Sequence, residues 1–130
     1  MLPNKTPDLE CWHRIVITRD LQDLIEILSE KVEFRSPFLW EPYSGQETVS
    51  KILWTVSEVF QDFTYHREIL DVNRWALEFS AMVREQPVKG IDLIEFDENG
   101  KISNFEVFVR PLAWLRALGQ EMARRLGGRE

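Results

Sequence analysis

Apolar and polar residues alternate with a period of two between Phe63 and Arg110, and this alternation limits the folds open to the chain. Such alternation is typical of strands, because successive side chains of a strand point to opposite faces of a sheet. It predicts four strands near residues 64–71, 75–83, 88–96 and 102–110. REQP at 84–87 is one turn candidate, and DENGK at 97–101 contains an Asn-Gly pair that favours a hairpin turn. We therefore expect a run of antiparallel strands.

Two helices are predicted before the strands. The first has Thr6 as its N-cap and Pro7 as its first residue. The second follows Asp20 and ends near Glu30. A short strand, VEFRSP, comes next, and the aromatic loop FLWEPYSG after it could close as a lid. The apolar positions at helical spacing are Leu9, Trp12, Ile15 and Val16, then Leu21, Leu24, Ile25 and Leu28.

Two more helices are predicted, one on each side of the strands. Ser44 and Glu47 have the spacing of a capping box, and the apolar stripe after them continues to Phe60. The last helix opens at Pro111 and is ended by Gly127 and Gly128. Helices followed by antiparallel strands predict an α+β architecture in which helices cover one face of a curved sheet.

The size and charge of the chain exclude several classes of protein. Its 130 residues, 44% hydrophobic and 29% charged, fit one domain spanning residues 1–130. A net charge of -6 opposes attraction to nucleic acid and to anionic lipid. The Arg124, Arg125 and Arg129 cluster could be a local basic patch, or cations that suit the end of a helix. No apolar run approaches the roughly 18 residues that cross a bilayer, so no membrane span is expected.

Known binding motifs are missing from the sequence. The single Cys11 cannot form an intramolecular disulfide and the start lacks a secretory signal, so we expect a cytoplasmic protein. Glycine-rich phosphate loops and the common zinc motifs are absent, so no cofactor and no metal are predicted. His66 and Glu68 alone are too few for a metal site.

The third predicted strand places a carboxylate among apolar residues. Gly90, Asp92, Ile94 and Phe96 share one side of it. If that side faces inward, burial makes the charged form costly, which raises the pKa or demands a hydrogen-bonding partner. A protonated carboxyl could then donate a hydrogen bond to a ligand oxygen, whereas an ionised one could act as a base. Asp92 could instead face outward, or be buried and bonded to a backbone amide.

The other strands also separate into two faces. One side of the second strand carries Trp75, Leu77, Phe79, Ala81 and Val83, and one side of the fourth carries Phe105, Val107 and Val109. We expect these sides to face the helices. Ile91 and Leu93 make the third strand apolar on its other face as well. A homodimer could cover them, although long neighbouring side chains are an alternative.

The order of elements, SPFLWEPYSG at 36–45 and GIDLIEFDENGKISNFEVFVRP at 90–111 resemble the nuclear transport factor 2-like superfamily. More narrowly, the chain resembles SnoaL-like polyketide cyclases and ketosteroid isomerases. The resemblance spans nearly the whole chain. It implies a cone-like fold, in which a strongly curved, mostly antiparallel sheet wraps around the N-terminal helices, with a C-terminal helix. It also implies a pocket at the open end and a homodimer formed through the outer sheet face.

The resemblance assigns positions to three residues. Asp92 matches the protonated aspartate that holds the steroid oxygen in ketosteroid isomerases, Trp12 falls at the oxygen-holding tyrosine, and Ser36 falls at the proton-moving aspartate. A serine hydroxyl is too weak a base for that step, and an indole NH donates a hydrogen bond without exchanging a proton. We therefore do not expect ketosteroid isomerisation here.

Two functions stay open at this point. The first is an isomerase, cyclase or dehydratase for a mostly apolar, oxygen-bearing small molecule, with Asp92 as acid or base and Trp12 orienting the oxygen. Glu41 and Tyr43 could assist, or lie exposed on their loop. The second is a noncatalytic ligand carrier or dimeric interaction module. The predicted ligand-binding residues are Trp12, Ser36, Phe38, Trp40, Phe79, Phe105 and Val107.

Overall fold

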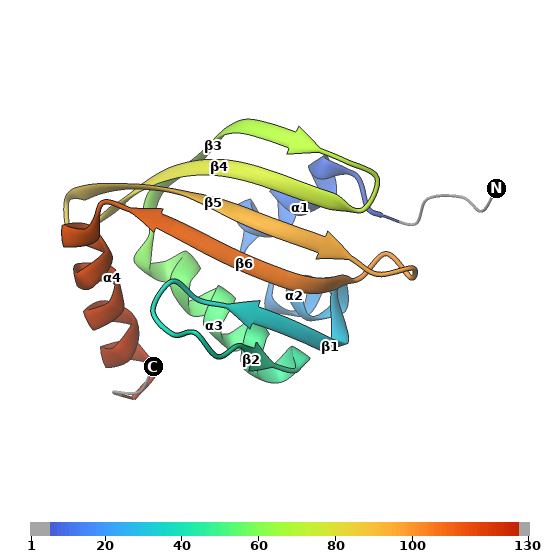
Figure 1. The fold of residues 1–130 in the computed structure, drawn as a ribbon, viewed down its shortest axis with the longest axis horizontal. Helices are drawn as coiled ribbons and strands as arrows, with labels where there is room; N and C mark the ends of the chain where they lie inside the picture. Colours follow the sequence, from blue (N-terminus) through green and yellow to red (C-terminus); the bar gives the residue numbers. More distant parts are fainter. Residues whose placement is uncertain (1–5, 128–130) are drawn as a thin grey trace.

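A computed structural model describes residues 6–127 as a curved sheet packed against helices (Figure 1). The helices are α1 (Leu9–Thr18), α2 (Leu21–Ile27), α3 (Gln46–Val59) and α4 (Leu112–Arg125). The strands are β1 (Leu28–Arg35), β2 (Tyr43–Ser44), β3 (Gln61–Leu70), β4 (Arg74–Val83), β5 (Gln86–Phe96) and β6 (Ile102–Arg110). Their order in the sheet is β2-β1-β6-β5-β4-β3, and all pairs are antiparallel except β1 with β6. The predicted α+β class is confirmed.

The predicted strands and turns match β3 to β6. The turn between β4 and β5 places Arg84 and Glu85 at φ values of 49° and 66°. The turn between β5 and β6 places Gly100 at 76°, and the Asp97 N–H donates to the carbonyl of Lys101. These turns fix the register of β4, β5 and β6, so that Leu77, Asp92 and Val107 stand side by side.

The inner face of the sheet carries the side chains that alternation assigned to it. Burial alternates along β5 from Val88 to Phe96, and Asp92 lies on the buried side. β4 buries the five predicted residues from Trp75 to Val83 in the same way. Figure 1 shows the sheet arching over α1, α2 and α3, with α4 across one end. None of the described helices combines the length and apolar character that crossing a bilayer requires.

The start of α1 and the end of α2 differ from the predictions. Asp8 caps α1 instead of Thr6, because its carboxylate accepts the Cys11 N–H at 2.8 Å. Thr6 donates to the carbonyl of Val72 instead. The α2 helix ends at Ile27 and not near Glu30, because Leu28 begins β1 and pairs with Ile102 of β6. A buried leucine satisfies the helical spacing and the strand equally well.

The predicted capping box of α3 is also wrong. Gly45 is the N-cap at a φ of 96°, and no side chain caps the helix. Ser44 belongs to β2, where it pairs with Glu33. Pro111 precedes α4 as its N-cap, and Gly127 follows the helix at a φ of 90°. Gly128 and Arg129 lie outside the described residues.

Candidate active site

A cavity lies between the inner face of the sheet and the helices. Its walls are mostly apolar, and α4 closes part of it with Leu118, Met122 and Leu126. Polar side chains reach the cavity from three places: Tyr65 and Asp92 from the sheet, Ser36 and Tyr43 from the β1 end and β2, and Arg19, Asp20 and Ser57 from the helices. A lining of this kind suits an apolar ligand that carries a few polar groups.

Asp92 is held on the central part of the sheet. Its neighbours on the inner face are Leu77 and Val107, and its exposed fraction is 7%. One carboxyl oxygen, Oδ2, accepts a hydrogen bond from the Tyr65 hydroxyl at 2.8 Å. Burial raises the pKa of Asp92 to about 7, although the hydrogen bond from Tyr65 opposes the rise. Near neutral pH this group can therefore both give and take a proton.

The second carboxyl oxygen of Asp92 is available to a ligand. Within residues 6–127, Oδ1 makes no hydrogen bond, and Asp92 lines the cavity. Asp92 Oδ1 is not among the buried side-chain atoms without a partner, so it is accessible from the cavity. The arrangement therefore leaves one position where a ligand oxygen can meet the carboxyl.

Tyr65 connects Asp92 to Trp12. The Trp12 indole NH donates to the Tyr65 hydroxyl at 2.9 Å, and that hydroxyl donates onward to Asp92. Burial and the nearby Asp92 charge raise the pKa of Tyr65 well above its usual value. Tyr65 therefore stays protonated and acts as a donor toward the carboxyl.

A polar pair supports the Tyr65 ring. The imidazole of His13 stacks on it with centroids 5.5 Å apart, and Phe63 meets it edge-on at 4.9 Å. His13 Nε2 lies 2.6 Å from a carboxylate oxygen of Glu68, which fixes the imidazole. These contacts orient the tyrosine, because His13 stacks on one face of its ring and Phe63 meets it perpendicularly.

Five of the predicted ligand-binding residues line the cavity: Trp12, Ser36, Phe38, Phe105 and Val107. The Trp12 indole NH donates to the Tyr65 hydroxyl and not to Asp92. The Ser36 hydroxyl oxygen accepts the Phe38 and Leu39 N–H groups at 3.2 and 3.3 Å, so it shapes the start of the loop. It is not placed as a base.

The structure puts Phe79 and Trp40 elsewhere. Phe79 is fully buried behind the cavity wall, where its ring stacks on Phe63 at 5.0 Å and lies tilted against Phe60 at 5.4 Å. Trp40 is 89% exposed on the aromatic loop. The ring of this loop that lines the cavity is Phe38. Of the two possible helpers, Tyr43 lines the cavity, and Glu41 is exposed.

Sequence reasoning missed Tyr65. Phe63 and Tyr65 alternate along a strand whose inner face was not assigned, and this alternation was the available signal. A buried tyrosine hydroxyl usually has a hydrogen-bond partner, and an inward aspartate on the same sheet is the natural one. Arg19 and Ser57, which line the cavity from the helical side, were missed as well.

Neither a protein-family model nor a curated protein sequence matches the chain. Solved structures do. A crystal structure of a steroid delta-isomerase from Pseudomonas aeruginosa is 50% identical, with a TM-score of 0.87 over 92% of this chain and 88% of that one. A bacterial protein with a cystatin-like fold from Silicibacter pomeroyi is 32% identical, with a TM-score of 0.88 over 95% and 87%. An NTF2-like protein from Cytophaga hutchinsonii shares the fold at 18% identity, with a TM-score of 0.63 over 82% and 89%.

The protein has a curved sheet packed against helices and an apolar cavity between them that holds one buried carboxyl, Asp92. This arrangement is typical of the class of cone-shaped proteins with a ligand pocket. The chain belongs to the nuclear transport factor 2-like superfamily, and its structural neighbours include steroid delta-isomerase.

Proposed function

We propose that the cavity binds a mostly apolar small molecule bearing a carbonyl or hydroxyl oxygen, and that Asp92 acts on it as an acid or base. The supporting observation is the Asp92 carboxyl itself, 7% exposed in an apolar cavity, with one oxygen fixed by Tyr65. A neutral carboxyl donates to a ligand oxygen, whereas its conjugate base removes a proton next to that oxygen. Isomerisation, cyclisation and dehydration all need such a transfer.

The likeness to the Pseudomonas aeruginosa steroid delta-isomerase favours isomerisation within this group of reactions. It does not supply a second carboxylate, because Ser36 occupies the position expected for a proton-moving base and its oxygen accepts two backbone N–H groups. Asp20 also lines the cavity, but its carboxylate caps α2 through the Asp23 N–H. We therefore propose chemistry in which Asp92 alone exchanges the proton, and not two-aspartate ketosteroid isomerisation.

The second candidate function is a noncatalytic ligand carrier, and the same engaged Ser36 hydroxyl favours it. A carrier needs the apolar cavity and one polar anchor, but no base in addition to Asp92. A thermal-shift screen of hydroxylated polycyclic and terpenoid compounds identifies ligands for both functions. A ligand at 100 times its dissociation constant raises the free energy of unfolding by about 2.7 kcal/mol.

Asp92→Asn then separates the two functions. An amide still accepts the Tyr65 hydrogen bond but cannot exchange a proton, so turnover of a screened ligand should fall by at least about a hundredfold. Binding of the same ligand should change much less. Glu95→Gln is the matched control, because Glu95 lies on the exposed face of the same strand. Ligand binding without product in the wild-type protein supports the carrier, and no thermal shift with any compound contradicts both functions.

We also propose that the chain forms a homodimer through the outer face of the sheet. Ile91, Leu93 and Phe108 are 42 to 51% exposed there, in the middle of β5 and β6. Charged side chains of both signs lie on the same strands: Glu78 pairs with Arg67 and Lys89 at 2.6 and 3.0 Å. A patch with an apolar centre and charges of both signs is complementary to a second copy of itself. The cytoplasmic location inferred from the single cysteine remains a prediction.

A further inference from the structure

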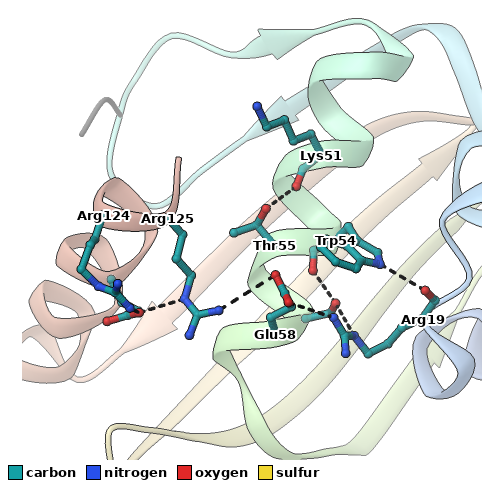
Figure 2. A network of polar contacts seen from close by, with 9 residues as sticks. Arg19, Lys51, Trp54, Thr55, Glu58, Arg124 and Arg125 are labelled. Atoms are coloured by element: carbon teal, nitrogen blue, oxygen red, sulfur yellow. Dashed lines mark hydrogen bonds and ion pairs between the residues drawn. The ribbon is translucent and has the colours of Figure 1, made fainter. Parts of the chain in front are cut away.

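Arg19 stands on the helical wall of the cavity in an unusually restrained position. It is the C-cap of α1 and adopts a left-handed backbone conformation, with a φ of 54°. Its guanidinium lies 5.0 Å from the centroid of the Trp54 ring, and its Nε donates to the Ser57 hydroxyl at 3.0 Å. The Trp54 indole NH donates back to the Arg19 carbonyl at 3.2 Å (Figure 2). Arg19, Trp54 and Ser57 all line the cavity.

The terminal nitrogens of this guanidinium are not fully used. Within the described part of the chain they donate no hydrogen bond, and the carboxylate paired with them, Glu58, is 3.7 Å away. Glu58 is shared, because Arg125 of α4 lies 3.9 Å from its other oxygen. A planar guanidinium with unused donors is suited to a two-oxygen anion.

An ion-pair network connects Arg19 with α3 and α4. The ion-pair network around α3 and α4 joins four arginines to two glutamates, an excess of two charges. Figure 2 shows Glu58 between Arg19 and Arg125. Asp20 on the cavity wall adds a negative charge next to Arg19, and capping α2 does not remove this charge. Around Arg19 itself the charges of Arg19 and Arg125 are balanced by those of Glu58 and Asp20, so the unused guanidinium donors, and not a net field, favour an anion there.

We infer that Arg19 recognises an oxyanion, such as a carboxylate or a sulfate, on the ligand. This inference rests on the proposed function, since it describes a second anchor in the cavity that Asp92 lines. The ligand is then an amphipathic acid, with a carbonyl or hydroxyl oxygen at the sheet wall and an anion at the helical wall. Its apolar body occupies the space between the aromatic and aliphatic side chains. Arg19 is a specificity residue in this arrangement and takes no part in proton transfer.

Two fluorescent probes that differ by one sulfonate group test the inference. They are 1-anilinonaphthalene-8-sulfonate and its uncharged parent, N-phenyl-1-naphthylamine. In the wild-type protein the sulfonate should bind more tightly than the parent. Arg19→Gln should weaken sulfonate binding by roughly tenfold, since a charge-assisted hydrogen bond is lost, and should leave the parent within about twofold. Arg19→Lys keeps the charge and should retain part of the preference.

Two controls make each outcome decisive. Arg14→Gln removes an exposed charge from the same helix, outside the cavity lining, and should change neither affinity. Val107→Trp fills the cavity and should abolish binding of both probes, with circular dichroism and thermal unfolding checking that the variant is folded. If Val107→Trp fails to fold, displacement of the parent probe by a ligand from the thermal-shift screen locates binding instead.

The outcomes distinguish the inference from the proposed function. If the parent probe does not bind in the cavity, the proposed function fails and the inference with it. If the parent binds there but the sulfonate has no advantage, the inference alone is overturned. Equal weakening of both probes in Arg19→Gln also overturns it, because a purely structural arginine would act on both.

Discussion

The buried Asp92 carboxyl makes the stability of the protein depend on pH near neutrality. Its pKa is about 4 in an unfolded chain and about 7 in the folded protein. Between pH 4 and pH 7, Asp92 is therefore protonated in the folded protein and ionised in the unfolded chain. The stabilising contribution is complete below pH 4, falls as the pH rises toward 7 and does not return above that.

Asp92→Asn should remove this dependence. An amide has no charge to bury, so the variant should unfold with a nearly constant free energy between pH 5 and 8. At pH 8 it should be more stable than the wild type by roughly 1 to 4 kcal/mol. Urea unfolding across this pH range measures the difference. Glu95→Gln, on the exposed face of the strand, should follow the wild-type curve.

The other carboxyls with shifted pKa values contribute little to the pH dependence of stability between pH 5 and 8. Ion pairs with arginine and lysine hold the pKa values of Glu78 and Glu121 below their usual range. A lowered pKa gives stability that is present above the unfolded value and is lost only as the pH falls. Parallel curves for Asp92→Asn and the wild type from pH 5 to 8 would therefore contradict a raised pKa at Asp92.

At the scale of residues, the sequence predicts the inward aspartate but not its partner. Gly90, Ile94 and Phe96 share its side of the strand, and a face of that composition is buried when the sheet packs on helices. Tyr65 lies 27 positions earlier in the chain, on a strand with charged and apolar residues on both sides. Only the register of β3, β4 and β5 brings the two side chains together, and that register depends on turns and bulges.

At the scale of elements, Gly90 allows the central strands to pack closely on an aromatic ring. A side-chain carbon added there would lie 2.3 Å from the Phe108 carbonyl oxygen and 2.6 Å from the Phe79 ring. Both neighbours are fixed, one as backbone of β6 and the other as a fully buried ring. Position 90 therefore requires glycine because a larger side chain would not fit between these neighbours, and not because of an unusual backbone angle.

Gly90→Ala should lower the free energy of unfolding by about 1 to 3 kcal/mol, because overpacking must displace a strand or a buried ring. Chemical denaturation measures the change. Gly119→Ala is the comparison: its added carbon would stand 3.1 Å from the edge of Phe38, a half-exposed ring that can shift. That variant should stay within about 1 kcal/mol of the wild type. Equal losses in the two variants would contradict the close packing at Gly90.

Element boundaries were predictable where one period prevailed. β3 to β6 lie close to their predicted bounds because alternation continues to the turns. The α2 boundary and the α3 cap were predicted wrongly because both depend on contacts with other elements. Leu28 pairs with β6, and the Gln46 amide donates to the carbonyls of Ile25 and Leu28, which tie the end of α2 to the start of α3. A local pattern does not contain these contacts.

At the scale of the whole molecule, a substitution on the outer sheet face tests the proposed homodimer. Phe108→Glu places a charge in the apolar centre of the proposed dimer contact, so sedimentation should change from a dimer to a monomer. Ile17→Glu is the matched control, because Ile17 is 79% exposed on α1, away from the sheet. That variant should sediment like the wild type. A monomeric wild-type protein at micromolar concentration would contradict the proposed dimer.

The parallel contact between β1 and β6 has a consequence for biosynthesis. Phe34 and Phe105 stand next to each other on these strands, and both line the cavity. A ribosome must therefore synthesise the chain through β6 before the wall of the cavity is complete. Until then, the edge of β1 that β6 will cover has no partner strand, and an unpaired edge of this kind can pair with other chains.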